Sequence, residues 1–235
     1  PQHKWATRRD EKASMDFGIK LTTKDFFNHE PLPIVEAQDE FLSRIKGAGI
    51  DFVEIQHNDD VSWEDINRLA GRCLEHELYA SVHPYPSENL RAEVFTETDS
   101  SDSLTELLNN VAAIKRITGR TVRLTFHGGV ANGSPCHQNL VDATAHAREF
   151  IAWMVNKVES DYPDILLLFE TQIPGGLGND GMVRLGDTFA SLLDLAEGTG
   201  ARFTWDFGHS FVSSRINKQA LQPPAEFLSR VGHVQ

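Results

Sequence analysis

The sequence contains few of the features that indicate a secreted or membrane-spanning protein. Only two of its 235 residues are cysteines, and Cys73 and Cys136 lie far apart and in no CxxC pair. This pattern fits a reducing compartment better than a disulfide framework. The longest apolar runs, such as Ile165–Phe169, are much shorter than the roughly 18 residues of a membrane-spanning helix, and residues 1–14 lack the apolar segment of a signal peptide. We therefore expect a cytoplasmic protein with no membrane partner.

Basic residues are also scarce. The chain has 34 acidic and 22 basic side chains and a net charge of -12, which disfavours a partner bound through a row of phosphates. Between Glu88 and Glu106, six acidic residues accompany a single basic one, Arg91, and would repel a nucleic-acid duplex. A small neutral substrate, or an anion bound locally, is easier to accommodate.

The remaining composition is that of one globular domain. With 40% hydrophobic and 24% charged residues, the sequence excludes a disordered, collagen-like or coiled-coil protein. Met15 stands directly before the first strand-like segment, so residues 1–14 are expected to be a tail or an upstream extension. Residues 15–235 show no linker, no low-complexity tract and no fixed repeat, and are predicted to form a single domain.

Short apolar or β-branched segments alternate with longer segments of helical periodicity, which is typical of βαβ units and a parallel sheet. The predicted strands are Phe17–Leu21, Phe52–Gln56, Leu78–His83, Val122–His127, Ile165–Glu170, Arg202–Asp206 and Val231 to the end. Seven successive β/α units favour an α/β fold of the (β/α)8 TIM barrel type over a doubly wound sheet. An eighth unit is expected after Gln235, so the chain is predicted to be a barrel truncated after its seventh strand.

The predicted helices each carry one apolar stripe. The clearest follows the i, i+3, i+4 spacing of a helix that buries one face, at Ile66, Leu69, Ala70, Cys73 and Leu74. A second stripe begins at Leu104, where Ser103 and Glu106 are predicted to form a capping box at the start of the helix.

Polar side chains end five consecutive predicted strands. They are His83, His127, Glu170, Asp206 and His233. Active sites of parallel barrels lie at the carboxyl ends of the strands, so these five side chains are predicted to converge on one rim. Each alone is explained by an ordinary loop contact, but five clustered ionisable groups are costly to desolvate unless they bind a cation.

Imidazole nitrogens together with carboxylate oxygens suit zinc, manganese, iron or cobalt, and the absence of cysteine from the set argues against a closed structural zinc site. We expect a divalent metal cofactor, namely zinc, manganese or cobalt. His209, three residues after Asp206, could be a ligand or a substrate-binding residue.

The strand ends resemble those of a known superfamily. The chain contains His83-Pro-Tyr85-Pro-Ser-Glu-Asn89-Leu90, Phe126-His127-Gly-Gly129, Leu168-Phe-Glu170-Thr, Trp205-Asp206-Phe-Gly-His209 and Gly232-His233-Val. In their order, and over about residues 16–235, these segments resemble the xylose isomerase-like superfamily of TIM barrels. That superfamily includes sugar and sugar-phosphate isomerases and epimerases, together with the endonuclease IV type of abasic-site nuclease.

The resemblance implies two alternative sets of roles. In the epimerase pattern Glu170, Asp206 and His233 are metal ligands, His209 lies near the substrate, and a glutamate on the eighth strand completes the site. In the nuclease pattern His83 and His127 also bind metal, within a three-zinc cluster that further needs residues expected after Gln235.

The first interpretation is a metal-dependent isomerase or epimerase of a small sugar or sugar phosphate, acting by proton transfer through an enediolate. Glu170 and His209 are its predicted catalytic residues, and His209, Tyr85 and Trp205 are predicted to bind substrate. The predicted metal ligands are Glu170, Asp206, His233, His127 and His83.

Two other interpretations stay open. A zinc phosphodiesterase acting on abasic-site DNA is favoured by His83 with His127 and by the glycine-rich segment Gly175–Gly178, and it is opposed by the acidic charge. A barrel that binds a ligand without turnover is the third. The sequence indicates no oligomeric state.

Overall fold

The computed structural model describes residues 18–22, 35–57, 62–84, 91–132, 137–174, 182–216 and 218–234. Residues 1–14, which we expect to be a tail, lie outside this part of the chain, as do Tyr85 and the segment Gly175–Gly178.

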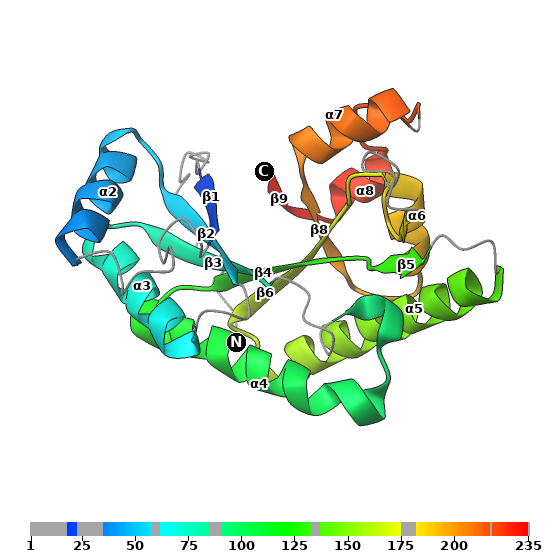
Figure 1. Ribbon diagram of the computed structural model, residues 1–235, viewed down its shortest axis with the longest axis horizontal. Coiled ribbons are helices and arrows are strands. Elements are labelled where there is room, and N and C mark those ends of the chain that lie inside the picture. Colours follow the sequence, from blue (N-terminus) through cyan, green and yellow to red (C-terminus); the bar gives the residue numbers. More distant parts are fainter. Residues whose placement is uncertain are drawn as a thin grey trace, which may run out of the picture.

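A curved sheet of seven parallel strands organises the fold (Figure 1). In spatial order they are β1 (Gly18–Thr22), β2 (Phe52–His57), β3 (Tyr79–Pro84), β4 (Val122–His127), β6 (Ile165–Glu170), β8 (Arg202–Trp205) and β9 (Val231–Val234). All seven predicted strands are confirmed, with ends that differ by at most one residue. Spatial order follows chain order, as expected when each strand joins the next through a crossover on the outside of a barrel.

Helices cover the outer side of this sheet (Figure 1). They are α2 (Val35–Gly47), α3 (Trp63–Glu75), α4 (Glu97–Thr118), α5 (His137–Asp161), α6 (Phe189–Leu195), α7 (Phe207–Ile216), α8 (Ala225–Ser229) and the 3-10 turn η2 (Ala92–Val94). Within the described residues, none of these helices combines the length and apolar character needed to cross a bilayer.

The stripe predicted from Ile66 lies on α3, and four of its five residues are buried while Leu74 is 39% exposed. The capping box predicted at Ser103 and Glu106 is wrong, because α4 begins two turns earlier. Thr96 is its N-cap, and the Thr96 hydroxyl oxygen accepts a hydrogen bond from the backbone N–H of Asp99. A threonine followed three residues later by a carboxylate is itself an adequate helix start, so the signal at Ser103 falls inside the helix.

A second, two-stranded sheet was not predicted. Strand β5 (Val130–Asn132) pairs antiparallel with β7 (Met182–Arg184), and each has only three residues, too few for a period-2 signal. The Gln172 side chain donates to the carbonyl oxygens of Gly129 and Leu185, which fixes this small sheet above the ends of β4 and β6.

Strand side chains alternate between two faces of the curved sheet. Apolar residues such as Val82, Leu124 and Phe169 face the helices and are buried there. The opposite face, toward the barrel interior, carries polar residues in register: Lys20 with Glu54 and Ser81, and His127 with Glu170, Thr204 and His233. The sheet is curved enough that the rings of Phe52 on β2 and His233 on β9 meet with their centroids 5.1 Å apart.

The turn after β4 leaves no room for a side chain. A Cβ atom on Gly128, which directly follows His127, would lie 2.5 Å from the backbone carbonyl oxygen of Leu185. We expect Gly128→Ala to lower the free energy of unfolding by about 1–3 kcal/mol, because backbone must move to accept the methyl group. Gly47→Ala is the matched control, since nothing lies within 4 Å of its added Cβ. Urea denaturation measures both, and equal stabilities of the two variants would contradict the prediction.

Candidate metal centre

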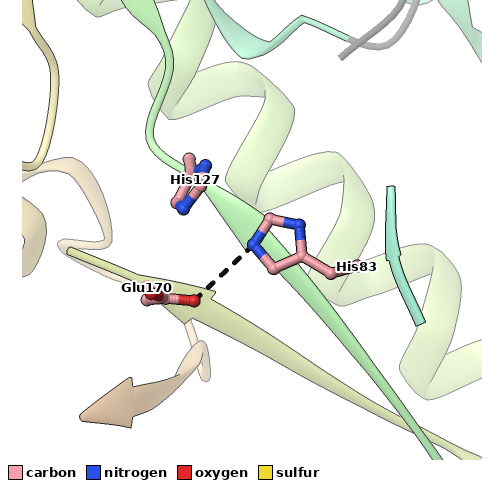
Figure 2. A group of neighbouring side chains, drawn as sticks. All are labelled: His83, His127 and Glu170. Carbon is pink, nitrogen blue, oxygen red and sulfur yellow. Dashed lines mark ion pairs between the residues drawn. The ribbon is translucent and has the colours of Figure 1, made fainter. Parts of the chain in front are cut away.

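Five polar side chains from four neighbouring units meet at the carboxyl end of the sheet. His83, His127 and Glu170 end β3, β4 and β6 and point into the interior (Figure 2). Asp206 directly follows β8, and His209 lies in the first turn of α7. Their ligand atoms form two groups, His83–His127–Glu170 and Glu170–Asp206–His209, and within each group these atoms lie within 4.8 Å of one another.

The first group is deeply enclosed. His83 is 2% exposed and Glu170 fully buried. The Nε2 atom of His83 lies 3.6 Å from Oε2 of Glu170, and the His83 and His127 rings meet edge to face with centroids 4.7 Å apart. Both imidazole rings therefore lie close to each other and to the Glu170 carboxylate.

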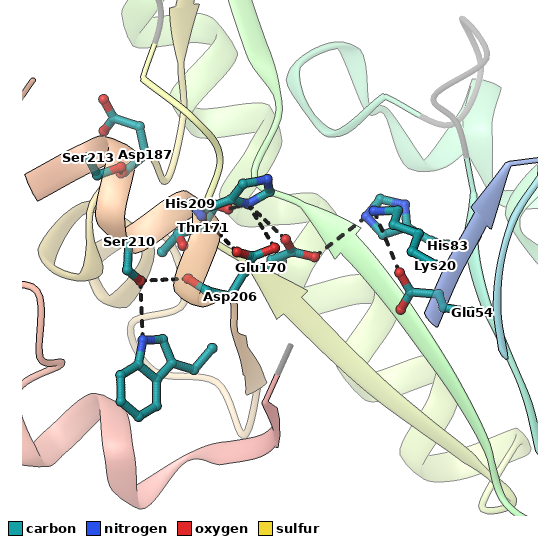
Figure 3. A network of polar contacts seen from close by, with 11 residues as sticks. Lys20, Glu54, His83, Glu170, Thr171, Asp187, Asp206, His209, Ser210 and Ser213 are labelled. Carbon is teal, nitrogen blue, oxygen red and sulfur yellow. Dashed lines mark hydrogen bonds and ion pairs between the residues drawn. The ribbon is translucent and has the colours of Figure 1, made fainter. Parts of the chain in front are cut away.

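The second group uses the other oxygen of the same carboxylate (Figure 3). Nδ1 of His209 lies 2.8 Å from Oε1 of Glu170 and 3.7 Å from Oδ2 of Asp206, and it also donates to the carbonyl oxygen of Thr171 at 2.6 Å. The backbone N–H of His209 donates to Oδ1 of Asp206 at 2.7 Å. The start of α7 thus positions the His209 ring and the Asp206 carboxylate together, and Glu170 bridges the two groups.

Burial and neighbouring charges shift the pKa values of these groups in different directions. Burial, assisted by the charge of His83, lowers the pKa of His127 to about 3, so this imidazole is neutral. Burial acts to raise the pKa of Glu170, but its polar contacts with the His209 and His83 imidazoles outweigh burial and hold that pKa well below its usual range. Burial also raises the pKa of Asp206. Burial acts to lower the pKa of His209, and its hydrogen bond to Glu170 reverses that, so the His209 pKa is raised.

These residues fit a divalent cation. The Nε2 atoms of His83 and His127 are buried and make no hydrogen bond in the described part of the protein, although buried polar atoms nearly always do. A neutral imidazole and an ionised carboxylate are the forms that bind metals, and a mixed nitrogen and oxygen set suits zinc, manganese or cobalt. The cluster therefore has the composition, protonation and unmet bonding capacity of a metal site.

A cavity of about 680 Å³ opens beside the cluster, within the range of small-molecule sites. His127 and Gln172 line it together with Arg91, Glu93 and His146. Cationic, anionic and amide groups thus line a cavity that reaches His127 of the candidate metal centre.

Two predicted site residues lie outside the two ligand groups, and a third lies outside the described residues. His233 is buried on the interior face but pairs with Thr204, two residues before Asp206 on β8, and neither ligand group found among the described residues includes it. Trp205 alternates with Thr204 and therefore lies on the helix side of β8, where its indole packs on Phe207 and donates to Ser210 Oγ. Tyr85 lies outside the described residues.

One interior residue was not singled out from the sequence. Lys20 on β1 lies 3.5 Å from Glu54 on β2 and forms an ion pair with it inside the barrel (Figure 3). The sequence offered one signal for it, a lysine in the middle of the short strand Gly18–Thr22. Strand alternation places Lys20 on the same face as Gly18 and Thr22.

No protein-family model and no curated protein sequence matches this chain. Solved structures do. L-Ribulose 3-epimerase has a TM-score of 0.60 and 18% identity over 94% of this chain and 69% of its own. A putative sugar phosphate isomerase/epimerase from Anabaena variabilis ATCC 29413 has a TM-score of 0.63 and 11% identity over 95% of this chain and 74% of its own.

An AP endonuclease of family 2 from Brucella melitensis is similar to the same extent, with a TM-score of 0.59 and 14% identity over 94% of this chain and 79% of its own. At such identities the likeness establishes the fold and leaves the reaction open. The chain has the TIM-barrel fold of these structures, as predicted from its sequence, and its candidate metal centre lies at the carboxyl ends of the strands, where parallel barrels place their active sites.

Proposed function

We propose that this protein is a metal-dependent isomerase or epimerase of a small sugar or sugar phosphate. The observation that carries the proposal is one buried carboxylate, that of Glu170, shared by two histidine-containing ligand groups at the mouth of the barrel. The fold is that of L-ribulose 3-epimerase and of a D-psicose 3-epimerase studied in the presence of D-fructose, which supports the same class of reaction here.

His83, His127 and Glu170 would hold the cation, with Asp206 and His209 as the alternative or additional ligands. A divalent cation supplies Lewis-acid stabilisation of the negative charge that develops on the substrate oxygens.

Glu170 is ionised, so the residue can accept the proton from the carbon next to the substrate carbonyl. Nδ1 of His209 donates to the Thr171 carbonyl and lies 2.8 Å from Oε1 of Glu170, which fixes its ring beside that carboxylate. Return of the proton from Glu170 to the neighbouring carbon gives the isomer, whereas epimerisation needs a second proton-transfer group that protonates the enediolate from the opposite face.

Exchange of the substrate α-proton with solvent tests this proposal directly. Protein loaded with zinc, manganese or cobalt is incubated in D₂O with a panel of ketoses and ketose phosphates, and ¹H NMR follows loss of the α-proton signal and appearance of a new sugar. We expect exchange with at least one member of the panel. Absence of exchange from every sugar with every metal would overturn the proposal.

A zinc phosphodiesterase acting on abasic-site DNA is the second candidate. Two ligand groups joined by one carboxylate can hold more than one cation, and the fold is also that of an AP endonuclease of family 2. The net charge of -12 and the acidic first turn of α4, with Glu97 and Asp99, oppose binding of a duplex. Cleavage of an abasic-site duplex by the zinc-loaded protein would favour this candidate, and no cleavage would remove it.

A further inference from the structure

A lysine ion pair lies inside the barrel. Lys20 and Glu54 are register partners on β1 and β2, and Nζ of Lys20 lies 3.5 Å from Oε1 of Glu54. The Glu54 side chain is 1% exposed, whereas that of Lys20 is 31% exposed. The carboxylate is thus buried in the wall of the barrel, while the Lys20 side chain stays partly exposed.

This lysine lies near the candidate metal centre. Glu54 pairs in register with Ser81, which lies two residues before His83 on the same face of β3, a step of about 6.6 Å along a strand. Lys20 is also one of the charges that act on His127, after burial and His83. Figure 3 shows Lys20 and Glu54 in the same interior space as His83 and Glu170.

The interior around the pair is polar where barrels are usually filled by branched apolar side chains. Ser81, Thr125 and Thr204 lie two residues before His83, His127 and Asp206 on their strands, and they are 2%, 0% and 0% exposed. Their hydroxyl oxygens have no hydrogen-bond partner among the described residues. Buried hydroxyls in such numbers require polar ligand atoms or ordered water.

We propose that Lys20 is a substrate-binding residue of the candidate active site, whose ammonium group, oriented by Glu54, hydrogen-bonds a substrate oxygen on which negative charge develops. The inference rests on the proposed function and adds a donor from β1, opposite the β6 carboxylate that takes the proton. The ligand class is an enediolate or another small oxyanion. The hydroxyls of Ser81, Thr125 and Thr204 bind the water or sugar hydroxyls that accompany it.

The test compares Lys20→Met with Lys20→Arg, which keeps the positive charge. The double variant Lys20→Met/Glu54→Gln removes both charges and so avoids leaving a buried carboxylate opposite a methyl group. Lys46→Met is the matched control, because Lys46 is a lysine at the end of α2 that pairs with Asp51 at 3.8 Å. Circular dichroism and metal content show whether each variant keeps its fold and its metal.

The first readout is sugar proton exchange. We expect Lys20→Met and the double variant to lose about 10²- to 10³-fold in kcat, with a smaller change in KM, as when one donor to a developing oxyanion is removed. Lys20→Arg and Lys46→Met should stay within about tenfold of the unaltered protein. Rates of Lys20→Met equal to those of Lys46→Met would overturn the inference while leaving the proposed function intact.

The second readout does not depend on turnover. Oxalate, a planar dianion with the oxygen arrangement of an enediolate, is titrated into the metal-loaded proteins by calorimetry. We expect the oxalate Kd to rise about 10- to 100-fold in Lys20→Met and in the double variant, and to stay unchanged in Lys46→Met. No oxalate binding by the unaltered protein, an unchanged Kd in Lys20→Met, or loss of metal with Lys20 each overturns the inference, even if no sugar is turned over.

Discussion

Replacement of Glu170 by glutamine is expected to abolish exchange of the substrate α-proton with solvent. The amide cannot accept a proton, and a positioned carboxylate base typically contributes about 10²- to 10⁴-fold to the rate. The change keeps the shape of a fully buried side chain that touches His83 and His209, so the fold should persist. Exchange rates in D₂O are measured by ¹H NMR, with circular dichroism as the check on folding.

Glu149→Gln is the control for this variant, because Glu149 is an exposed glutamate on α5. It should retain the exchange rate of the unaltered protein. A Glu170→Gln variant that is folded and exchanges the proton at the unaltered rate would contradict the assignment of Glu170 as the base.

Truncation of Phe150 is expected to have the largest effect on stability. Phe150 on α5 is 1% exposed, and its ring centroid lies 5.7 Å from that of Phe95, 5.3 Å from that of Phe126 and 6.4 Å from that of Phe169. Phe150→Ala removes this contact set and leaves a cavity, so the free energy of unfolding should fall by about 3–5 kcal/mol. Urea denaturation gives the value.

The same truncation is expected to disturb the candidate metal centre. Phe126 and Phe169 directly precede His127 and Glu170, so loss of their common support loosens both predicted ligands. Val141→Ala, at a 60% exposed position of the same helix, should change stability by no more than about 0.5 kcal/mol. A loss of less than about 1 kcal/mol in Phe150→Ala would contradict this description of the core.

The fold could be predicted from the sequence because its local signals agree with one another. Short apolar runs such as Ile165–Phe169 alternate with helical stripes, and the structure places a strand at each predicted run. The short antiparallel pair β5–β7 has no such signal, because three residues cannot show a period. The start of α4 was predicted too late, because two threonine or serine positions offered caps and sequence alone did not rank them.

The site residues that could be predicted from the sequence are those at the carboxyl ends of the strands. His83, His127 and Glu170 lie at the carboxyl ends of neighbouring parallel strands, and barrel closure brings such ends together whatever their separation in sequence. His233 also ends a predicted strand, but its distance from the cluster depends on register. An irregularity between β8 and β9 at Phe203 and Thr204 pairs it with Thr204, and residue spacing does not reveal that shift.

Lys20 depends on register for the same reason. A lysine within a strand can point to either face of the sheet, and the sequence does not say which. The register pairing of Lys20 with the buried Glu54 assigns Lys20 to the interior face. Trp205 is the opposite case. It was predicted to line the site because it precedes Asp206, but adjacent residues of a strand point to opposite faces, and Trp205 packs on Phe207 instead.

The account rests on one shared cation beside Glu170, and metal retention tests this most directly. Protein loaded with zinc and dialysed is assayed for bound metal by mass spectrometry, in unaltered form and as His127→Ala, Glu170→Ala and the control His76→Ala. The His76 imidazole pairs with Asp39, and His76 caps the end of α3 before the amino end of β3. We predict about one or more equivalents of zinc in the unaltered protein and in His76→Ala, and affinity at least about 100-fold weaker in the other two, since even outer contacts of a metal site are worth 10- to 100-fold. No retained metal, or retention unaffected by His127→Ala and Glu170→Ala, would contradict the account.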